Sequence, residues 1–323
     1  MTERTSSGPN QIERGMVIKA HSGFFTVHLE SDSTLVTCQV AGRLTQNKHT
    51  VDVLAIGDWV WFEPVRSEGN VNGRIVAVEP RLRVLSRKDP IAGTKEQDIQ
   101  QVLVANLELV TFVFACSQPD FHPRLLDRYL VGAEAQRIPV LVCANKVDLV
   151  GLDLARQMFS VYEKIGYRVL YTSMINRLGI DELYSALHGK LSVLTGKSGV
   201  GKTSLLNCLI PGLGKEVGDM SVLLHKGKHT TVVPELLQLD STSWIADTPG
   251  LRSYAIWDVE AGELDAYYRE IAPYVSQCLF SDCTHIHEPG CAVIAAVERS
   301  EIPKERYESY RRLRLELDRQ RKW

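Results

Sequence analysis

The chain has 323 residues, of which 44% are hydrophobic and 24% are charged, and its formal net charge is −2. This composition is that of a soluble globular protein, and the length suits two or three domains. The near-neutral charge excludes a global field that draws the chain onto nucleic acid or membrane, so RNA binding needs a local basic face. No apolar run is long enough to cross a bilayer, and the polar first residues lack the apolar core of a signal peptide. We therefore expect a cytoplasmic monomer that does not contact a membrane.

The first part of the chain predicts a small β-barrel. Short β-rich runs alternate there with Gly, Asn and Ser, which is typical of a closed barrel, and an OB-like barrel fits best. The predicted strands are 15–18, 24–29, 35–40, 58–62 and 75–78. We assign residues 1–95 to this domain and expect its first 14 residues to form a mobile tail.

Over residues 96–255 the sequence pattern changes to one that predicts alternating strands and helices. This alternation predicts an α/β domain with a doubly wound, mostly parallel sheet. The predicted strands are 109–114, 138–144, 167–171 and 191–195, and the predicted helices are 124–135, 151–165 and 180–188. Residues 256–323 are predicted to be helical, with a cysteine-histidine interruption and a basic end.

A phosphate-binding loop lies in the middle of the chain. The pattern G-x-x-x-x-G-K-[ST] is matched by Gly196, Lys197, Ser198, Gly199, Val200, Gly201, Lys202 and Thr203, after an apolar strand and before a helical run that includes Ser204. The glycines let backbone N–H groups turn toward phosphates, and the helix N-terminus adds partial positive charge. Lys202 neutralises the β and γ phosphates, and the Thr203 hydroxyl can bind Mg²⁺. A Gly-rich turn with a chance lysine is the alternative, but the strand–loop–helix setting argues against it.

The tetrapeptide Asn145-Lys146-Val147-Asp148 predicts a guanine pocket. The Asp148 carboxylate can accept hydrogen bonds from guanine N1–H and the exocyclic amine, which adenine cannot donate, so an unpaired carboxylate rejects adenine by at least a few kcal/mol. Asn145 holds the neighbouring loop, and the Lys146 stem can lie over the purine. Alone, the tetrapeptide is equally well a solvated turn. Ser173, after the next strand, supports the pocket because its backbone can contact the guanine oxygen.

The base-reading motif precedes the phosphate-binding loop here, which is the opposite of their usual order in GTPases. A Ras-like GTPase opens on the phosphate loop and places the base-reading strand near its end, whereas here Asn145 precedes Gly196. The sequence therefore predicts a circularly permuted GTPase domain whose switch regions come last.

Asp247-Thr248-Pro249-Gly250 follows a strand and predicts one switch. Asp247 can hold Mg²⁺ through water, and the Gly250 N–H can sense the γ-phosphate. Leu251 stands close to where many GTPases have a water-positioning glutamine. Intrinsic hydrolysis should therefore be slow unless another group or a partner orients the water.

A polar segment over residues 225–231 is the other predicted switch. Thr230 or Thr231 can bind Mg²⁺ and the γ-phosphate, and spacing does not choose between them. His229 is the best candidate to orient the attacking water, with a solvated loop histidine as an equally weighted alternative. Gly199 replaces the asparagine of potassium-activated GTPases, so we predict no potassium dependence.

Four metal-ligand side chains cluster near the C-terminus. Seven cysteines in a cytoplasmic protein indicate metal binding or catalysis rather than disulfides. The set Cys278, Cys283, His285 and Cys291 suits one structural, tetrahedral Zn²⁺ that holds a small helical module together. His287 is a rival ligand, although the short step from Cys283 favours His285.

Basic residues are scattered through the loops and the exit of the predicted barrel. They are Arg43, Lys48, His49, Arg66, Arg74, Arg81, Arg83, Arg87 and Lys88. With exposed aromatics they could form a face for nucleic acid. From the sequence alone, a solvated surface with Trp59 and Trp61 partly in the core is the stronger interpretation.

Taken together, the chain resembles the RsgA family of circularly permuted GTPases that depend on the small ribosomal subunit. The resemblance covers the barrel, the permuted motifs and the cysteine cluster, and it rests on residues 126–130, 145–148, 198–203, 228–231, 247–250, 278–291 and 307–310. The departures are Glu108 for aspartate, Lys197 for glutamine and Val232 for a third threonine. The last of these leaves the Mg²⁺-binding threonine open.

The resemblance implies GTP hydrolysis stimulated by the small ribosomal subunit and a role in late maturation of that subunit. It also implies that the barrel and the zinc module contact rRNA and that His229 is catalytic. Two other functions remain open at this point. One is an RNA-binding scaffold that senses GTP or GDP without turnover, and the other is a P-loop enzyme acting on a different nucleotide or acceptor.

Overall fold

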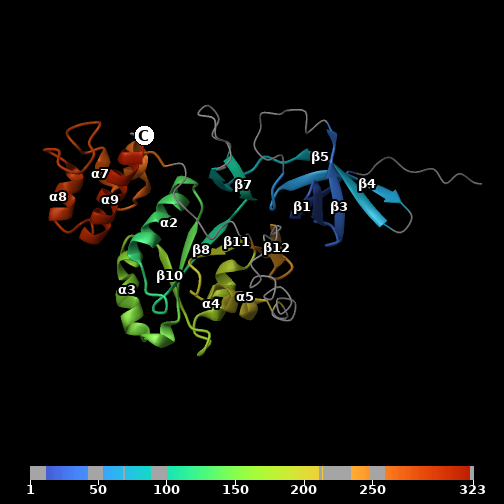
Figure 1. The fold of residues 1–323 in the computed structure, drawn as a ribbon, viewed down its shortest axis with the longest axis horizontal. Helices are drawn as coiled ribbons and strands as arrows, with labels where there is room; N and C mark the ends of the chain where they lie inside the picture. Colours follow the sequence, from blue (N-terminus) through green and yellow to red (C-terminus); the bar gives the residue numbers. More distant parts are fainter. Residues whose placement is uncertain are drawn as a thin grey trace, which may run out of the picture. The chain divides into compact units, whose positions relative to one another are not determined.

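A computed structural model describes residues 12–42, 54–67, 70–88, 100–210, 213, 234–247 and 259–320 of the chain (Figure 1). The chain divides into two compact units. The first unit comprises residues 1–108, 188–193 and 215–250, and the second comprises residues 109–187, 194–214 and 251–323.

The first unit contains a closed five-stranded barrel. Its strands are β1 (Glu13–His21), β2 (Phe24–Leu29), β3 (Leu35–Val40), β4 (Trp59–Ser67) and β5 (Asn70–Val78). β1 pairs antiparallel with both β2 and β4, β2 with β3, and β4 with β5, while β3 and β5 pair in parallel and close the circuit. This is the strand order of an OB-fold, so the predicted barrel is confirmed.

Alternating side chains fill the inside of the barrel. Val17, Val27, Val60 and Ile75 are each fully buried there. A Cβ on Gly73 would lie 2.6 Å from the Cys38 sulfur, so only glycine lets β5 approach this core.

The rest of the first unit is strand-rich as well. β6 (Val84–Lys88) and β7 (Gln100–Ala105) form an antiparallel pair, and β12 (Glu235–Gln238) pairs antiparallel with β13 (Trp244–Asp247). β13 runs parallel to the start of β11 (Leu191–Thr195). β12 meets the barrel at β1, where Lys19 and Glu235 form a 2.7 Å ion pair.

The second unit carries the predicted α/β alternation. β8 (Leu109–Ala115), β9 (Val140–Asn145) and β10 (Arg168–Thr172) are parallel neighbours in the order β10-β9-β8. The helices between and after them are α2 (Pro123–Ala135), η1 (Val147–Leu149), α3 (Leu152–Lys164), α4 (Ile180–Leu187) and α5 (Lys202–Leu209). Every residue of β8 is buried, which is typical of a central strand covered on both faces.

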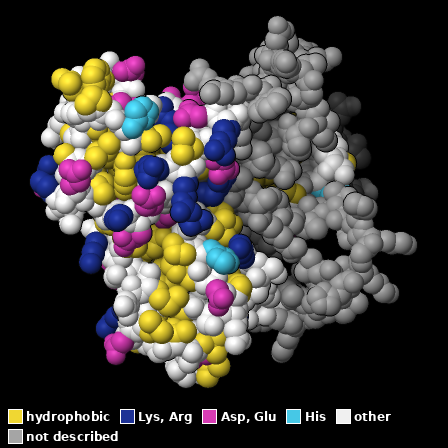
Figure 2. Space-filling model, turned by 60° about the vertical axis from the view of Figure 1, so that its left-hand side comes forward, with side chains coloured by type: hydrophobic (Ala, Val, Ile, Leu, Met, Phe, Trp, Pro, Cys, Tyr) yellow, Lys and Arg dark blue, Asp and Glu magenta, His cyan; other side chains and the backbone are white. Residues whose placement is uncertain are grey.

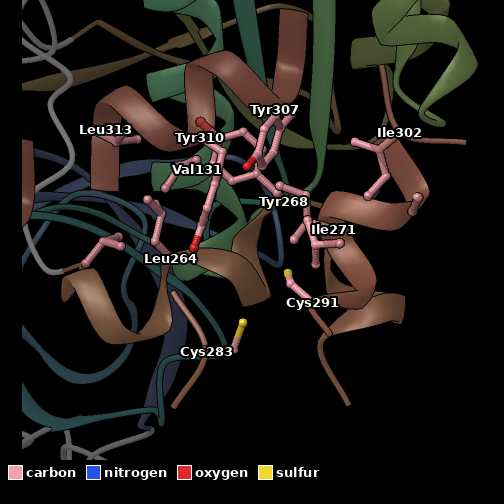
Figure 3. Packing of buried hydrophobic residues seen from close by; sticks show 13 residues of the cluster. Val131, Leu264, Tyr268, Ile271, Cys283, Cys291, Ile302, Tyr307, Tyr310 and Leu313 are labelled. Atoms are coloured by element: carbon pink, nitrogen blue, oxygen red, sulfur yellow. The ribbon is translucent and has the colours of Figure 1, made fainter. Parts of the chain in front are cut away.

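A helical module completes the second unit. It contains η3 (Ala261–Tyr267), α7 (Ala272–Val275), α8 (Ala292–Glu298) and α9 (Lys304–Gln320). Figure 3 shows its core, in which Leu264, Tyr268 and Tyr310 meet Val131 of α2. The module is therefore packed directly onto the first helix of the α/β part.

A buried ion network reinforces this packing. Arg306 of α9 is 1% exposed, pairs with Asp127 of α2 and lies 2.6 Å from Glu270 through its Nε atom. The Tyr162 hydroxyl donates a 3.0 Å hydrogen bond to the same Asp127 carboxylate. These contacts thus hold α2, α3 and α9 together, although the three helices are distant in the sequence.

Charged side chains of both signs are scattered among apolar ones on the face of the second unit that Figure 2 brings forward. Arg128 of α2 pairs with Glu316 of α9, and Arg269 pairs with Glu134. Within the described ranges, the molecule has no helix with the length and apolarity that crossing a bilayer requires.

Candidate functional site

The phosphate loop connects β11 to α5, and its glycines are sterically required. Gly196, Gly199 and Gly201 have φ angles of 151°, 83° and 100°, which L side chains rarely adopt. A Cβ on Gly196 would overlap the Val113 carbonyl oxygen, and one on Gly201 would overlap the Asn145 side-chain amide. The loop therefore lies against β8 and β9 with no room for side chains at these two positions.

The Lys202 ammonium is held inside the loop. Its Nζ atom donates to the carbonyl oxygens of Gly196 (2.6 Å) and Lys197 (2.7 Å). The residues from Lys197 to Gly199, together with Thr203 and Ser204, are exposed. Because the Lys197 contact uses the backbone, lysine in place of the family's glutamine leaves it unchanged.

Asn145 joins the base-reading strand to the phosphate loop. It ends β9, is 1% exposed, and donates from Nδ2 to the Val200 carbonyl at 2.9 Å. Its Oδ1 atom accepts a 3.0 Å hydrogen bond from the Thr172 hydroxyl, which itself lies 3.2 Å from the Cys143 sulfur. The carboxyl ends of β9, β10 and β11 are thereby brought to one place, where open α/β sheets bind ligands.

The remaining base-pocket residues lie beside Asn145. Asp148, in η1, accepts a 2.5 Å hydrogen bond from the Ser173 hydroxyl. Lys146 adopts a left-handed conformation with φ 61° before η1, and its ammonium donates to the Gln118 carbonyl. The buried Val147 anchors the turn. The Asp148 carboxylate, the Lys146 ammonium and the Ser173 backbone could thus contact one planar polar ring of a ligand.

The four predicted metal ligands form a second site. One ligand atom from each of Cys278, Cys283, His285 and Cys291 lies within 4.8 Å of the others. The Nδ1 atom of His285 is 3.5 Å from the Cys278 sulfur and 3.4 Å from the Cys291 sulfur. The side chain of His287 is exposed, and the structure does not group it with the sulfurs. Three sulfurs and one imidazole suit tetrahedral Zn²⁺ with no open position.

The surroundings act in opposite directions on two of the cysteine thiols. Burial opposes ionisation of Cys278, but backbone N–H groups of Ala292 and Val293 outweigh it and lower the pKa of this thiol. Burial raises the pKa of Cys283 to about 12. Because the thiolate is the form that binds metal, a cation bound here would have to displace the proton of Cys283.

Comparison with known proteins identifies the family. Residues 78–257 match the family model described as RsgA GTPase, and residues 14–71 match the RsgA N-terminal domain. The chain belongs to the RsgA GTPase family. It is 39% identical over 303 residues to the small ribosomal subunit biogenesis GTPase RsgA of Gemmatimonas aurantiaca, which covers 94% of this chain and 97% of that one. The RsgA of Alkaliphilus metalliredigens is 35% identical over 97% of this chain and 100% of its own.

Two solved structures are similar to the chain over most of its length. YjeQ from Thermotoga maritima superposes with a TM-score of 0.77 at 32% identity, over 95% of this chain and 99% of that one. YloQ, described as a circularly permuted GTPase, gives 0.73 at 30% identity over 96% of both chains. The reversed motif order is thus confirmed as circular permutation, and the chain is a GTP hydrolase by family.

Part of the predicted RsgA nucleotide site falls outside the described residues. His229, Thr230, Thr231 and Gly250 lie there. Asp247 ends β13 in the first unit, and its side chain is also outside the described set. Their roles stay predictions.

Several residues that support the two sites have no local signature in the sequence. Around the base pocket they are Thr172 and Gln118, which contact Asn145 and Lys146. Neither is marked by a motif, because the first uses a hydroxyl at a strand end and the second only its backbone. The departure Glu108 has a role too, since its Oε2 atom accepts a 2.8 Å hydrogen bond from the Leu191 N–H.

The metal-binding loop has its own supports. Glu288 accepts backbone N–H groups of Thr284 (2.9 Å), Ile286 (3.0 Å) and His287 (3.1 Å), which closes the loop on itself. From α9, Tyr307 donates to the His285 carbonyl at 2.8 Å and Tyr310 to the Thr284 carbonyl at 3.0 Å. Figure 3 shows the Tyr307 and Tyr310 rings in the core that also includes Cys283 and Cys291.

Two of the basic residues scattered over the predicted barrel have carboxylate partners in the structure. Arg81 makes a bidentate pair with the fully buried Asp58, at 2.8 and 2.7 Å, and so holds the barrel exit together. Arg74 pairs with Glu63 on the neighbouring strand. Trp61 is 38% exposed, so its side chain is only partly in the core, as expected. Aromatic surface is therefore available on the barrel, whereas these two arginines already have carboxylate partners.

Proposed function

We propose that the chain hydrolyses GTP to GDP and phosphate on stimulation by the small ribosomal subunit and acts in late maturation of that subunit. The observation that carries this proposal is the Asn145 side chain, which is bonded to the phosphate loop at Val200 and so unites the base and phosphate halves of one nucleotide site. The relatives described above carry the name small ribosomal subunit biogenesis GTPase, which supports the choice of partner.

In this proposal the nucleotide occupies the carboxyl ends of the parallel strands. Asp148 accepts hydrogen bonds from the guanine edge, Lys146 lies along the purine, and the Ser173 backbone contacts the guanine oxygen. The backbone N–H groups from Gly196 to Ser204 surround the phosphates, and Lys202 neutralises the charge that develops between β and γ phosphates.

Mg²⁺ and the attacking water are assigned to the switch residues. Thr203 and Asp247, with either Thr230 or Thr231, would hold the Mg²⁺ that neutralises phosphate charge. Gly250 senses the γ-phosphate through its N–H, and His229 orients the water. Because Leu251 cannot do so, the chain by itself hydrolyses GTP slowly, and docking on the subunit places the water-orienting group.

We assign the three segments different tasks. Residues 1–95 form a barrel that contacts rRNA, residues 96–255 form the GTPase, and residues 256–323 form a module held by one Zn²⁺ on Cys278, Cys283, His285 and Cys291. We further propose that the protein works as a cytoplasmic monomer, with no role for a membrane.

The deciding experiment measures phosphate release with and without purified small subunits. We expect turnover to rise by at least tenfold when subunits are added. Equal rates with and without subunits would contradict this proposal and would favour the alternative function, an RNA-binding scaffold that senses nucleotide. Asp148→Asn should shift preference from GTP to xanthosine triphosphate, because the new amide donates where the carboxylate accepted. Asp153→Asn, an exposed aspartate in the first turn of α3, is the matched control. Unchanged nucleotide preference in Asp148→Asn would point to a P-loop enzyme of another specificity.

A further inference from the structure

The imidazole of His285 is held from both sides. Its Nδ1 atom faces the cysteine sulfurs, and its Nε2 atom lies 3.0 Å from the Oδ2 atom of Asp265. His285 is fully buried, and the Asp265 side chain is 13% exposed. The contact is therefore a largely dehydrated pair of an imidazole and a carboxylate.

This geometry fixes which nitrogen can bind metal. A ligating imidazole must present a lone pair at Nδ1, so its proton resides on Nε2, where the Asp265 carboxylate accepts it. The carboxylate also makes the imidazole a better electron donor toward a cation. Without an acceptor at this position, the ring is free to turn or to carry its proton on the other nitrogen.

Asp265 comes from a different part of the chain than the ligands. It belongs to η3, the first described element after Asp247, whereas the ligands lie between Cys278 and Cys291. Its neighbour Leu264 is fully buried in the core of the helical module. Besides the four candidate ligands, the site thus includes Asp265, which contacts His285. This residue lies on the segment that follows the GTPase motifs in the sequence.

We propose that Asp265 is the positioning residue of the metal site. It sets the tautomer and orientation of His285, and through this contact it ties η3 to the metal-binding loop. The inference rests on the metal assignment made under the proposed function. It adds to the metal site a residue outside the Cys₃His set. It also connects the metal-binding loop to η3, which follows the last GTPase motif in the sequence.

A purely local role for Asp265 makes a different prediction. Its Oδ1 atom accepts a 2.9 Å hydrogen bond from the Ala266 N–H, so the residue also shapes the turn of η3. If this were its whole role, substitution would lower stability equally with and without metal. If it positions His285, substitution must change metal affinity and the spectrum of the bound ion.

The test uses the full-length protein and three variants. Asp265→Ala removes the acceptor, Asp265→Asn keeps an acceptor without charge, and Glu263→Gln changes an exposed carboxylate of the same η3 element as a control. Zinc affinity is measured by competition with a chromophoric chelator. Substituted Co²⁺ reports ligand geometry through its visible absorption.

We expect Asp265→Ala to lose about 10–100-fold in zinc affinity, Asp265→Asn to lose less, and the control to match the parent chain. The Co²⁺ bands should shift in Asp265→Ala while thiolate charge transfer persists. Affinity and spectrum equal to the parent in Asp265→Ala would overturn the proposal, even if stability fell. A parent chain without thiolate charge transfer would reject the metal site itself, and this role with it, while leaving the GTPase proposal standing.

Discussion

Asn145 Nδ2 lies 2.9 Å from the Val200 carbonyl oxygen, although the two residues are 55 positions apart. In a chain whose motif order is permuted, this bond restores the neighbourhood of base and phosphate that an unpermuted GTPase has. It satisfies a carbonyl in the phosphate loop with a side chain from the base-reading strand.

Asn145→Ala should therefore weaken GDP and GTP binding together. Truncation removes the donor to the Val200 carbonyl and leaves this oxygen in the phosphate loop without that partner, which costs about 1–3 kcal/mol, or roughly 5–150-fold in Kd. Fluorescent-nucleotide titration measures the effect. Asn176→Ala, an exposed asparagine in the loop after β10, should bind nucleotide like the parent chain. Equal losses in both variants would contradict the role of Asn145.

Gly201→Ala should abolish nucleotide binding while the protein stays folded. The new Cβ overlaps the Asn145 amide, and the φ angle of 100° adds strain. Gly189→Ala separates the two effects, since that glycine has a φ of 69° but open space around its Cβ position. We expect Gly189→Ala to lower stability by about 1 kcal/mol and to keep normal nucleotide affinity. The comparison requires nucleotide titration and circular dichroism on the same samples.

Arg306→Met should destabilise the second unit. The Asp127 and Glu270 side chains are each 4% exposed, and removal of the guanidinium leaves both charges buried without their partner. The expected loss in the free energy of unfolding is about 3–5 kcal/mol in urea titrations. Arg312→Met, exposed on the same helix, should change it by less than about 0.5 kcal/mol. A small effect at Arg306 would mean that the module stays attached by its apolar core alone.

Zinc binding should weaken as the pH falls. Burial places the pKa of the metal-free Cys283 thiol at about 12, so a proton must leave when the metal binds near neutral pH. Lower pH favours the protonated, metal-free form, and the stability contributed by zinc is lost in that direction. Chelator competition between pH 8 and pH 6 should show falling affinity, and the thermal midpoint in excess chelator should lose this dependence. A pH-independent affinity would show that the thiols do not exchange protons for metal.

Residues with a local signature could be predicted from the sequence. Gly196 to Thr203 and Asn145 to Asp148 carry their chemistry within a few positions, and the barrel strands alternate apolar and polar residues. The metal ligands are close in sequence as well. The barrel and the α/β alternation are confirmed by the structure, whereas the nucleotide-binding and metal-binding roles of these residues stay predictions.

Long-range partners could not be predicted in this way. Asp265 is 20 positions from His285, and nothing around it in the sequence distinguishes it from a surface aspartate. β6, β7 and β12 were not predicted either, since short strands depend on the partner they meet rather than on their own pattern. The sequence shows which reactive and polar side chains are present. Which distant residues and strands contact one another depends on how the chain packs.

The ion pair between Arg306 and Asp127 also bears on how the protein is made. The two residues are 179 positions apart, and α2 leaves the ribosome long before α9 does. Domains generally begin to fold from their N-terminal side during synthesis. Until α9 emerges, the carboxylate of Asp127 lacks its Arg306 partner, and the face of α2 around Val131 lacks the contacts that α9 supplies. The second unit can therefore complete its packing only after α9 has been synthesised, so the cation that pairs with Asp127 arrives late in its folding.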